Sequence, residues 1–196
     1  MGKIVKKKHD IIKNLERLIF FGLLSIPVIV ISWRTLFNVK SHGFYRFFSW
    51  ECIIWLFVTN YTFWFYNPFG VKQIFSWIFL LLSGYLIIAG VILMKKMGKP
   101  GENREEKTLY KLEKTSILID IGIFKYIRHP LYSSLLFFTW GILLKNVTVS
   151  LLFVALLSTA FLYLTAIFEE KECIKCFGKK YSEYMKRSKR FIPFII

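Results

Sequence analysis

The sequence predicts an all-α fold: a polytopic membrane helix bundle with four or five spans, a C-terminal helical hairpin and cytosolic amphipathic tail helices. Three observations support this prediction. Of the 196 residues, 55% are hydrophobic and 19% aromatic, which fits an ordinary soluble domain poorly. The apolar residues form runs close to the roughly 20 residues that cross a hydrocarbon core. The formal net charge is +16, and Lys and Arg lie almost entirely outside those runs, as in a membrane protein beside an anionic leaflet.

Five apolar runs are candidate spans. No small-residue cleavage site follows the first, so we expect it to be retained rather than removed as a signal peptide. The fourth run is short, and Lys145-Asn146 separates it from the fifth. This predicts a tight helical hairpin whose first arm is extended backwards by Arg128-His129-Pro130. The five runs are residues 18–37, 47–66, 74–94, 131–144 and 147–168.

The basic residues bear on the number of crossings. Six Lys or Arg residues precede the first run, nine lie between residues 95 and 128, and eight follow residue 168. Segments rich in these residues stay on the cytosolic side. Four crossings would put all three segments there, and the run at 47–66 would then lie partly in the interface, because half of it is aromatic and it carries Glu51 and Asn60. Five crossings would put the N-terminus opposite, and both alternatives stay open.

The composition suggests a division after the third span. Residues 1–94 are predicted to form N-terminal membrane spans, and residues 95–196 a cytosolic loop, the hairpin and the tail. The loop opens with turn residues at 98–101 and becomes partly apolar at 117–124.

The tail after the last run is predicted to be helical. We expect an amphipathic helix at 169–177, stopped by Gly178, and a second short helix around 181–189. Tyr181 and Tyr184 are three residues apart on one face of that helix, so we expect them to pack it onto the hairpin.

The sequence argues against nucleic-acid binding by the basic residues and against disulfide or metal binding by the cysteines. No basic stripe with interleaved aromatic residues lies on a predicted soluble element, so we expect no nucleic-acid partner. Cys52, Cys173 and Cys176 are too few for a disulfide framework, which fits a reducing cytosolic face. The Cys-x-x-Cys formed by the last two lacks a second pair of ligands, so no metal site is expected.

Three motifs follow one another in the C-terminal half. They are GIFKYIRHPLYSSLLF at 122–137, EEKECIKCFGKKYSEY at 169–184 and RFIP at 190–193. In this order and at these separations they resemble the isoprenylcysteine carboxyl methyltransferase and phospholipid methyltransferase superfamily. The resemblance covers about residues 118–193. It departs from the family at Phe124, where Tyr is usual, and at Ser134, where Gly is common.

The resemblance implies an enzyme that takes a methyl group from S-adenosylmethionine. The acceptor would be lipophilic, an isoprenylcysteine-like carboxylate or a lipid amine, reaching the site from the bilayer. It further implies an integral protein of the cell (cytoplasmic) membrane with its cofactor site facing the cytosol. The oligomeric state is not predicted.

The implied site lies between the loop that enters the hairpin and the helix that leaves it. Carboxylates or aromatic rings can face the cationic parts of the cofactor, and an arginine can hold a carboxylate. The implied catalytic residues are Arg128, Glu169 and Glu170. The implied cofactor-binding residues are Leu118, Ile121, Gly122, Tyr126, His129, Pro130, Tyr132 and Glu169.

Each charged residue also has a structural interpretation. Arg128 could snorkel to the interface, and His129 could bond backbone groups freed by Pro130. Glu169 and Glu170 could form a solvated helix face. However, two carboxylates at a helix C-terminus face an unfavourable dipole, so we expect a specific cationic partner.

Two other functions are weighed against methyl transfer. Membrane sterol and isoprenoid reductases have a similar hairpin and tail, and Glu169-Glu170 with Cys173 partly matches their pattern. Tyr181 stands where they have Trp, and RHPLY fits the methyltransferases better. A membrane scaffold or transporter subunit is the third hypothesis. The near absence of ionisable residues within the spans, Glu51 apart, argues against an ion pathway.

Overall fold

The computed structural model describes residues 2–97 and 117–195, with side chains from Ile11 onward. The turn predicted at 98–101 lies outside the described residues. The described chain is helical, which confirms the all-α prediction. Its helices are α1 (Gly2–Ser32), α2 (His42–Asn60), α3 (Val71–Met97), α4 (Pro130–Leu143), α5 (Val149–Phe177) and α6 (Lys179–Arg187), with 3-10 turns η1 (Tyr61–Phe63) and η2 (Gly122–Lys125).

Three helices are long and apolar enough to cross a membrane, namely Ile11–Ser32 within α1, Val71–Met97 and Val149–Phe177. They contain most of the first, third and fifth predicted runs. α4 matches the fourth run and is shorter. These helices make the molecule an apolar bundle, as the sequence predicts.

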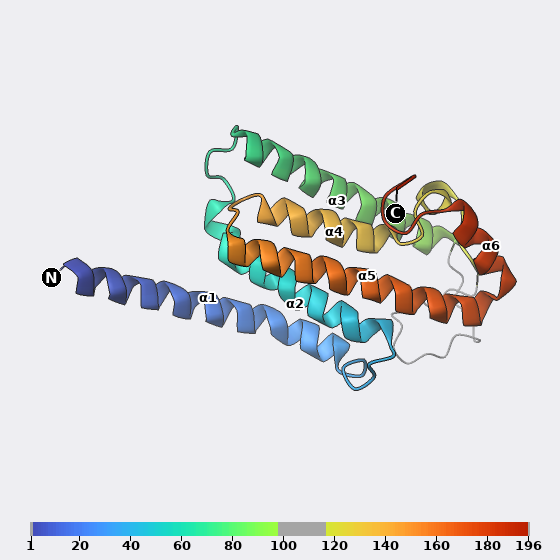
Figure 1. Ribbon diagram of the computed structural model, residues 1–196, viewed down its shortest axis with the longest axis horizontal. Coiled ribbons are helices and arrows are strands. Elements are labelled where there is room, and N and C mark those ends of the chain that lie inside the picture. Colours follow the sequence, from blue (N-terminus) through green and yellow to red (C-terminus); the bar gives the residue numbers. More distant parts are fainter. Residues whose placement is uncertain (1, 98–116, 196) are drawn as a thin grey trace.

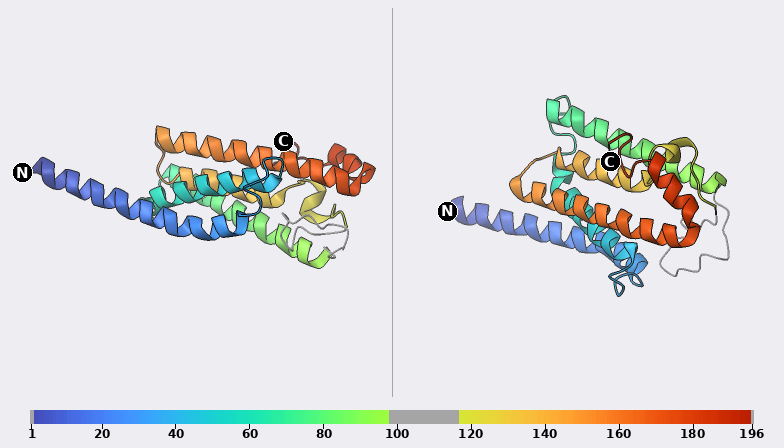
Figure 2. Two further views of the ribbon diagram at one scale, coloured as in Figure 1. Left: turned by 90° about the horizontal axis from the view of Figure 1, so that it is seen from below. Right: turned by 45° about the vertical axis from the view of Figure 1, so that its right-hand side comes forward.

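The helices α1 to α5 run side by side, with α6 at one end (Figure 1). The N-terminus lies at the opposite end of the bundle from α6 (Figures 1 and 2). α2 packs against α1 and α5, so residues 47–60 of the second run lie in a helix of the bundle, and η1 follows. The choice between four and five crossings, and the partly interfacial position considered for this run, stay predictions.

Small polar side chains join the helices in the apolar interior. Ser49 Oγ lies 3.1 Å from Ser158 Oγ, between α2 and α5. Ser76 Oγ of α3 donates to the carbonyl of Gly141 at 2.6 Å, and a Cβ at Gly141 would come within 3.0 Å of the Leu80 side chain. Residues of this size let helices approach closely and hydrogen-bond in an apolar surrounding.

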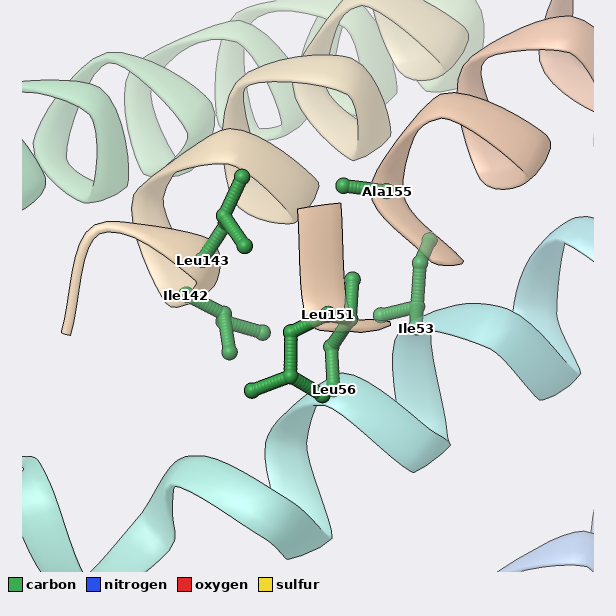
Figure 3. Packing of buried hydrophobic residues seen from close by; sticks show 6 residues of the cluster. All are labelled: Ile53, Leu56, Ile142, Leu143, Leu151 and Ala155. Carbon is green, nitrogen blue, oxygen red and sulfur yellow. The ribbon is translucent and has the colours of Figure 1, made fainter. Parts of the chain in front are cut away.

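A cluster of buried aliphatic residues fills the end of the bundle near the α4–α5 turn (Figure 3). α2, α4 and α5 all contribute to it. Many large apolar side chains on the outer faces of α1, α3 and α5 are exposed, as expected of helices that face lipid. The cluster consists of Ile53, Leu56, Ile142, Leu143, Leu151 and Ala155.

The hairpin forms as predicted. Pro130 is the first residue of α4, where its missing N–H leaves no bond unmade. Thr148 caps α5 by accepting from the backbone N of Leu151 at 3.3 Å. At the turn, the buried Lys145 ammonium lies 3.6 Å from the centre of the Trp77 ring, which compensates for its removal from water.

The tail differs from the prediction in one respect. α5 continues without a break to Phe177, so residues 169–177 do not form a separate helix. Neither Gly nor Pro occurs between the apolar span and the polar segment, and a change of polarity alone does not end a helix. Glu169 and Glu170 therefore lie inside a helix and not at its C-terminus. The cationic partner expected for them is nevertheless present, because Arg128 and Arg190 bind Glu170. Gly178 does end it, with φ +56°, and α6 follows as predicted.

Candidate functional site at the tail end of the bundle

The C-terminal segment lies along the chain that enters the hairpin. The backbone N of Lys189 donates to the carbonyl of Tyr126 at 2.9 Å, and the N of Arg128 donates to the carbonyl of Lys189 at 2.7 Å. The N of His129 donates to the carbonyl of Arg190 at 3.2 Å. These bonds hold the tail against the first residues of the hairpin.

Glu170 joins α5 to both of these segments. It accepts from Arg128 Nε at 2.9 Å, and Arg190 binds it with two donors at 2.6 and 3.1 Å. Glu170 is 4% exposed. Arg128 Nη1 donates in addition to the carbonyls of Met185, at 3.2 Å, and Ser188. The predicted meeting of Arg128 with a carboxylate of this pair is thus present at Glu170, and this ion pair holds the tail in place.

His129 contacts the other carboxylate. Its Nδ1 lies 3.2 Å from Glu169 Oε2, and its Nε2 lies 3.5 Å from Glu170 Oε1. The ring stacks on Tyr132 with centroids 5.4 Å apart. Burial alone would lower the pKa of His129, but its hydrogen bonds with the carboxylates of Glu169 and Glu170 outweigh burial and raise the pKa above its usual value. The protonated imidazole is therefore favoured here.

This raised pKa predicts a pH-dependent stability. The protonated His129 contributes fully below its unfolded pKa of 6.5, and the contribution is lost as the pH rises through the higher folded pKa. The melting temperature of the wild type should exceed that of His129→Gln most below pH 6.5, and the difference should shrink towards alkaline pH. Thermal unfolding in detergent at a series of pH values measures it. A difference that does not change with pH would contradict the assignment.

Tyr181 and Tyr184 pack α6 onto the bundle, as predicted. Both are buried and contact Cys173 of α5. The hydroxyl of Tyr184 donates to the carbonyl of Phe124 at 2.5 Å, which fixes the loop that enters the hairpin. The three cysteines, all in the described chain, are free thiols, and no metal-binding group of His, Cys, Asp or Glu occurs among the described residues.

Replacing Tyr184 with Phe tests whether the hydrogen bond of the Tyr184 hydroxyl stabilises the loop that enters the hairpin. The buried carbonyl of Phe124 would lose its donor, so the free energy of unfolding should fall by about 1 kcal/mol. Thermal unfolding of the detergent-solubilised protein measures the difference, with Tyr66→Phe, at an exposed position, as the matched control. Equal melting temperatures for the two variants would contradict this role.

Two cavities meet at this end of the bundle. The first, here called the tail chamber, is lined by Leu118, Phe177, Tyr181 and Tyr184 among others. The second, here called the apolar chamber, has a volume of about 370 Å³ and lies among α2, α3 and α4. Five residues line both chambers and form what we call the junction: Met94, Phe124, Arg128, His129 and Glu169.

The predicted site residues occupy different places. Arg128, His129 and Glu169 lie at the junction, and Leu118 lines the tail chamber. Pro130 and Tyr132 line the apolar chamber. The predicted residues that line neither chamber are Ile121, Gly122, Tyr126 and Glu170.

Of those four residues, Gly122 has a structural role, and Ile121 and Tyr126 lie at the surface. Gly122 has φ +57°, and a Cβ there would come within 2.7 Å of the Leu93 side chain, so the turn requires glycine. Ile121 and Tyr126 are 46% and 47% exposed. Their cofactor contacts stay predictions from the resemblance.

Sequence reasoning did not select Arg46 and Trp50 of α2, which also line the apolar chamber. Arg46 is 3% exposed, and its guanidinium lies 5.3 Å from the centre of the Trp50 ring. An arginine directly before the apolar run at 47–66 was the available signal, since a charge beside a span is rarely placed without a partner or a role.

The fold and the site together define an integral membrane helix bundle with a charged junction between two chambers at one end. Residues 78–180 match the model of the phospholipid methyltransferase family. This match covers more than half of the chain, and the chain belongs to that family. The matched segment includes the junction residues Arg128, His129 and Glu169, and the resemblance read from the motifs is confirmed.

Two curated proteins are similar to the chain. Protein-S-isoprenylcysteine O-methyltransferase of Schizosaccharomyces pombe is 30% identical over 134 residues, which cover 66% of this chain and 56% of that protein. Methanethiol S-methyltransferase of Pseudomonas deceptionensis is 34% identical over 71 residues, covering 36% of this chain and 26% of that protein. The chain thus matches about half or less of the length of these relatives. No solved structure matches. These comparisons give no support to a reductase.

Proposed function

We propose that this membrane protein is a methyltransferase that uses S-adenosylmethionine and methylates a lipophilic acceptor. The observation that carries the proposal is the junction. Arg128, His129 and Glu169 line both the tail chamber and the apolar chamber, so a polar donor and an apolar acceptor can meet there. The relatives named as methyltransferases support the same reaction class.

The side chains present fit the charges of this cofactor. Glu169 is a partly buried carboxylate at the junction, with its side chain 16% exposed, and it can face a sulfonium or an ammonium group. Phe177 and Tyr181 offer aromatic faces in the tail chamber, which suit an adenine ring or a cation. When bound, S-adenosylmethionine supplies an electrophilic methyl group.

The residues of the chain then have separate tasks. Glu169 balances positive charge, and its contact with His129 fixes its position. The ion pairs of Glu170 with Arg128 and Arg190 hold the tail across this end and keep water out. The acceptor is aligned by the walls of the apolar chamber, and an acceptor that is already a carboxylate needs no base. An amine acceptor would need one, and Glu169 is the better placed of the two glutamates because Glu170 is held by two guanidinium groups.

We further propose that the tail end of the bundle faces the cytosol of the cell membrane and that α1 to α5 all cross. The basic residues after residue 168 favour this side for the tail. In this arrangement residues 1–94 supply spans that shape the acceptor chamber, whereas residues 95–196 supply the junction and the tail.

Radiolabelled methyl transfer tests the proposal. The purified protein, supplied with methyl-labelled S-adenosylmethionine and an extracted membrane lipid pool, should place label in the organic phase. A parallel sample is given a nicotinamide cofactor and followed by its absorbance. Oxidation of that cofactor without transfer of label would refute the proposal and favour the reductase.

A further inference from the structure

We propose that a pocket at the end of the bundle opposite the tail binds the phosphate of an anionic phospholipid head group. This pocket, here called the far pocket, lies between the start of α3 and the turn that joins α4 to α5 (Figure 1). Its volume is about 360 Å³, within the range of small-molecule sites. The lining that the structure describes holds two lysines, Lys72 and Lys145, and no carboxylate.

Lys145 is a buried cation whose partners are neutral. It is 4% exposed. Its ammonium group donates to Gln73 Oε1 at 3.0 Å and to the carbonyl of Trp64 at 3.3 Å, and lies 3.6 Å from the centre of the Trp77 ring. These groups hold the ammonium in place, but none of them carries a negative charge. Because a charge away from bulk water acts strongly on its surroundings, Lys145 attracts an anion to the pocket even with its own donors in use.

The chain around the far pocket supplies no counter-charge either. No Asp or Glu occurs at 52–97 or at 121–168, the segments that contain the lining and the helices beside it. α1 passes this end of the bundle, where Phe20 stacks on Tyr61. Its residues 11–20 include two basic residues and one acidic residue, so α1 adds no net negative charge. The negative charge that suits this pocket therefore comes from a ligand.

The side chains of the lining can bind a phosphate directly. Lys72 is exposed at the pocket and can form an ion pair with a phosphate oxygen. The amides of Asn67 and Asn146 add further N–H donors. A choline or ethanolamine head group would bring an ammonium group as well, and the described lining has no carboxylate to receive it. An anionic head group is therefore preferred to a zwitterionic one.

The position of the pocket points to a lipid rather than a soluble anion. Gln73 lines the far pocket and Met94 lines the junction. The stretch of α3 between them rises by about 30 Å, the thickness of a hydrocarbon core. The far pocket thus lies at the level of the head groups in the leaflet opposite the tail. Phe65, Phe69 and Val71, at or next to the lining, are exposed, as expected of apolar side chains that contact lipid.

Native mass spectrometry of the detergent-solubilised full chain tests the proposal. The protein is titrated with phosphatidylglycerol and with phosphatidylcholine of the same acyl chains, and inorganic phosphate serves as a soluble competitor. The wild type should bind phosphatidylglycerol about tenfold more tightly than phosphatidylcholine. Lys72→Gln should weaken the binding of phosphatidylglycerol about tenfold, the effect of losing one charge-assisted hydrogen bond. Lys145→Met should weaken it as well.

Lys40→Gln is the matched control, because it removes an exposed lysine at the other end of α2, and it should bind as the wild type does. Equal affinity of the wild type for the two lipids, or equal affinity of Lys72→Gln and Lys40→Gln for phosphatidylglycerol, would overturn the proposal. Displacement of the lipid by an equal concentration of inorganic phosphate would indicate a site for a soluble anion and would overturn it too. If Lys145→Met does not fold, Lys72→Gln decides. None of these results bears on the junction, so the proposed function is tested separately.

Discussion

Replacing Glu169 with Gln is expected to reduce methyl transfer strongly while leaving the bundle folded. Glu169 is the one carboxylate among the junction residues, and the neutral amide cannot balance a sulfonium or ammonium charge. Losing about 3 kcal/mol of charge-assisted interaction should lower kcat/KM about 100-fold or more. Radiolabelled transfer and calorimetric titration with S-adenosylmethionine measure the effect.

The control for this variant is Glu183→Gln, which removes an exposed carboxylate from α6. It should retain wild-type activity and affinity for the cofactor. The melting temperature of Glu169→Gln should fall only slightly, because the amide can still contact His129. Wild-type transfer by a folded Glu169→Gln protein would show that Glu169 has no part in the site.

Replacing Glu170 with Gln should instead detach the tail. The buried guanidinium of Arg128 and its partner Arg190 would lose their shared counter-charge, and removing one member of a buried ion pair destabilises by about 3 to 5 kcal/mol. We expect a lower melting temperature and faster tryptic cleavage at the basic residues that follow Gly178. Loss of activity should accompany this change.

Limited proteolysis followed by mass spectrometry separates the two glutamates. Glu170→Gln should be cleaved in the tail faster than the wild type, whereas Glu169→Gln and Glu183→Gln should be cleaved at the wild-type rate. Equal cleavage of all four proteins would mean that the ion pairs of Glu170 do not hold the tail.

The different roles of Glu169 and Glu170 show what the sequence could predict. Pro130 at the helix start, Gly178 at the helix end and the short hairpin turn have local signatures, so the meeting of Arg128 with the glutamates followed from them. Adjacent residues on a helix point about 100° apart, so only one of the two can face a given neighbour. Which of the two glutamates faces the chambers depends on how α5 is rotated about its own axis, and local sequence patterns do not determine that rotation.

The contact of Glu170 with Arg190 of the tail could not be predicted from local sequence patterns either. Arg190 reaches it because the backbone of Lys189 pairs with Tyr126 and Arg128, a contact between distant segments that no periodicity indicates. Arg46 was not predicted as a site residue because α2 lies outside the segment that carries the family motifs. Only the packing of α2 against α5 brings it to the apolar chamber.

Calorimetric titration of the purified wild-type protein with S-adenosylmethionine tests the central claim most directly, because every proposed role depends on a donor at the junction. The predicted result is saturable binding at one site per chain, lost in Glu169→Gln and retained in Glu183→Gln. Absence of binding to the folded wild type, or equal binding to all three proteins, would contradict the claim.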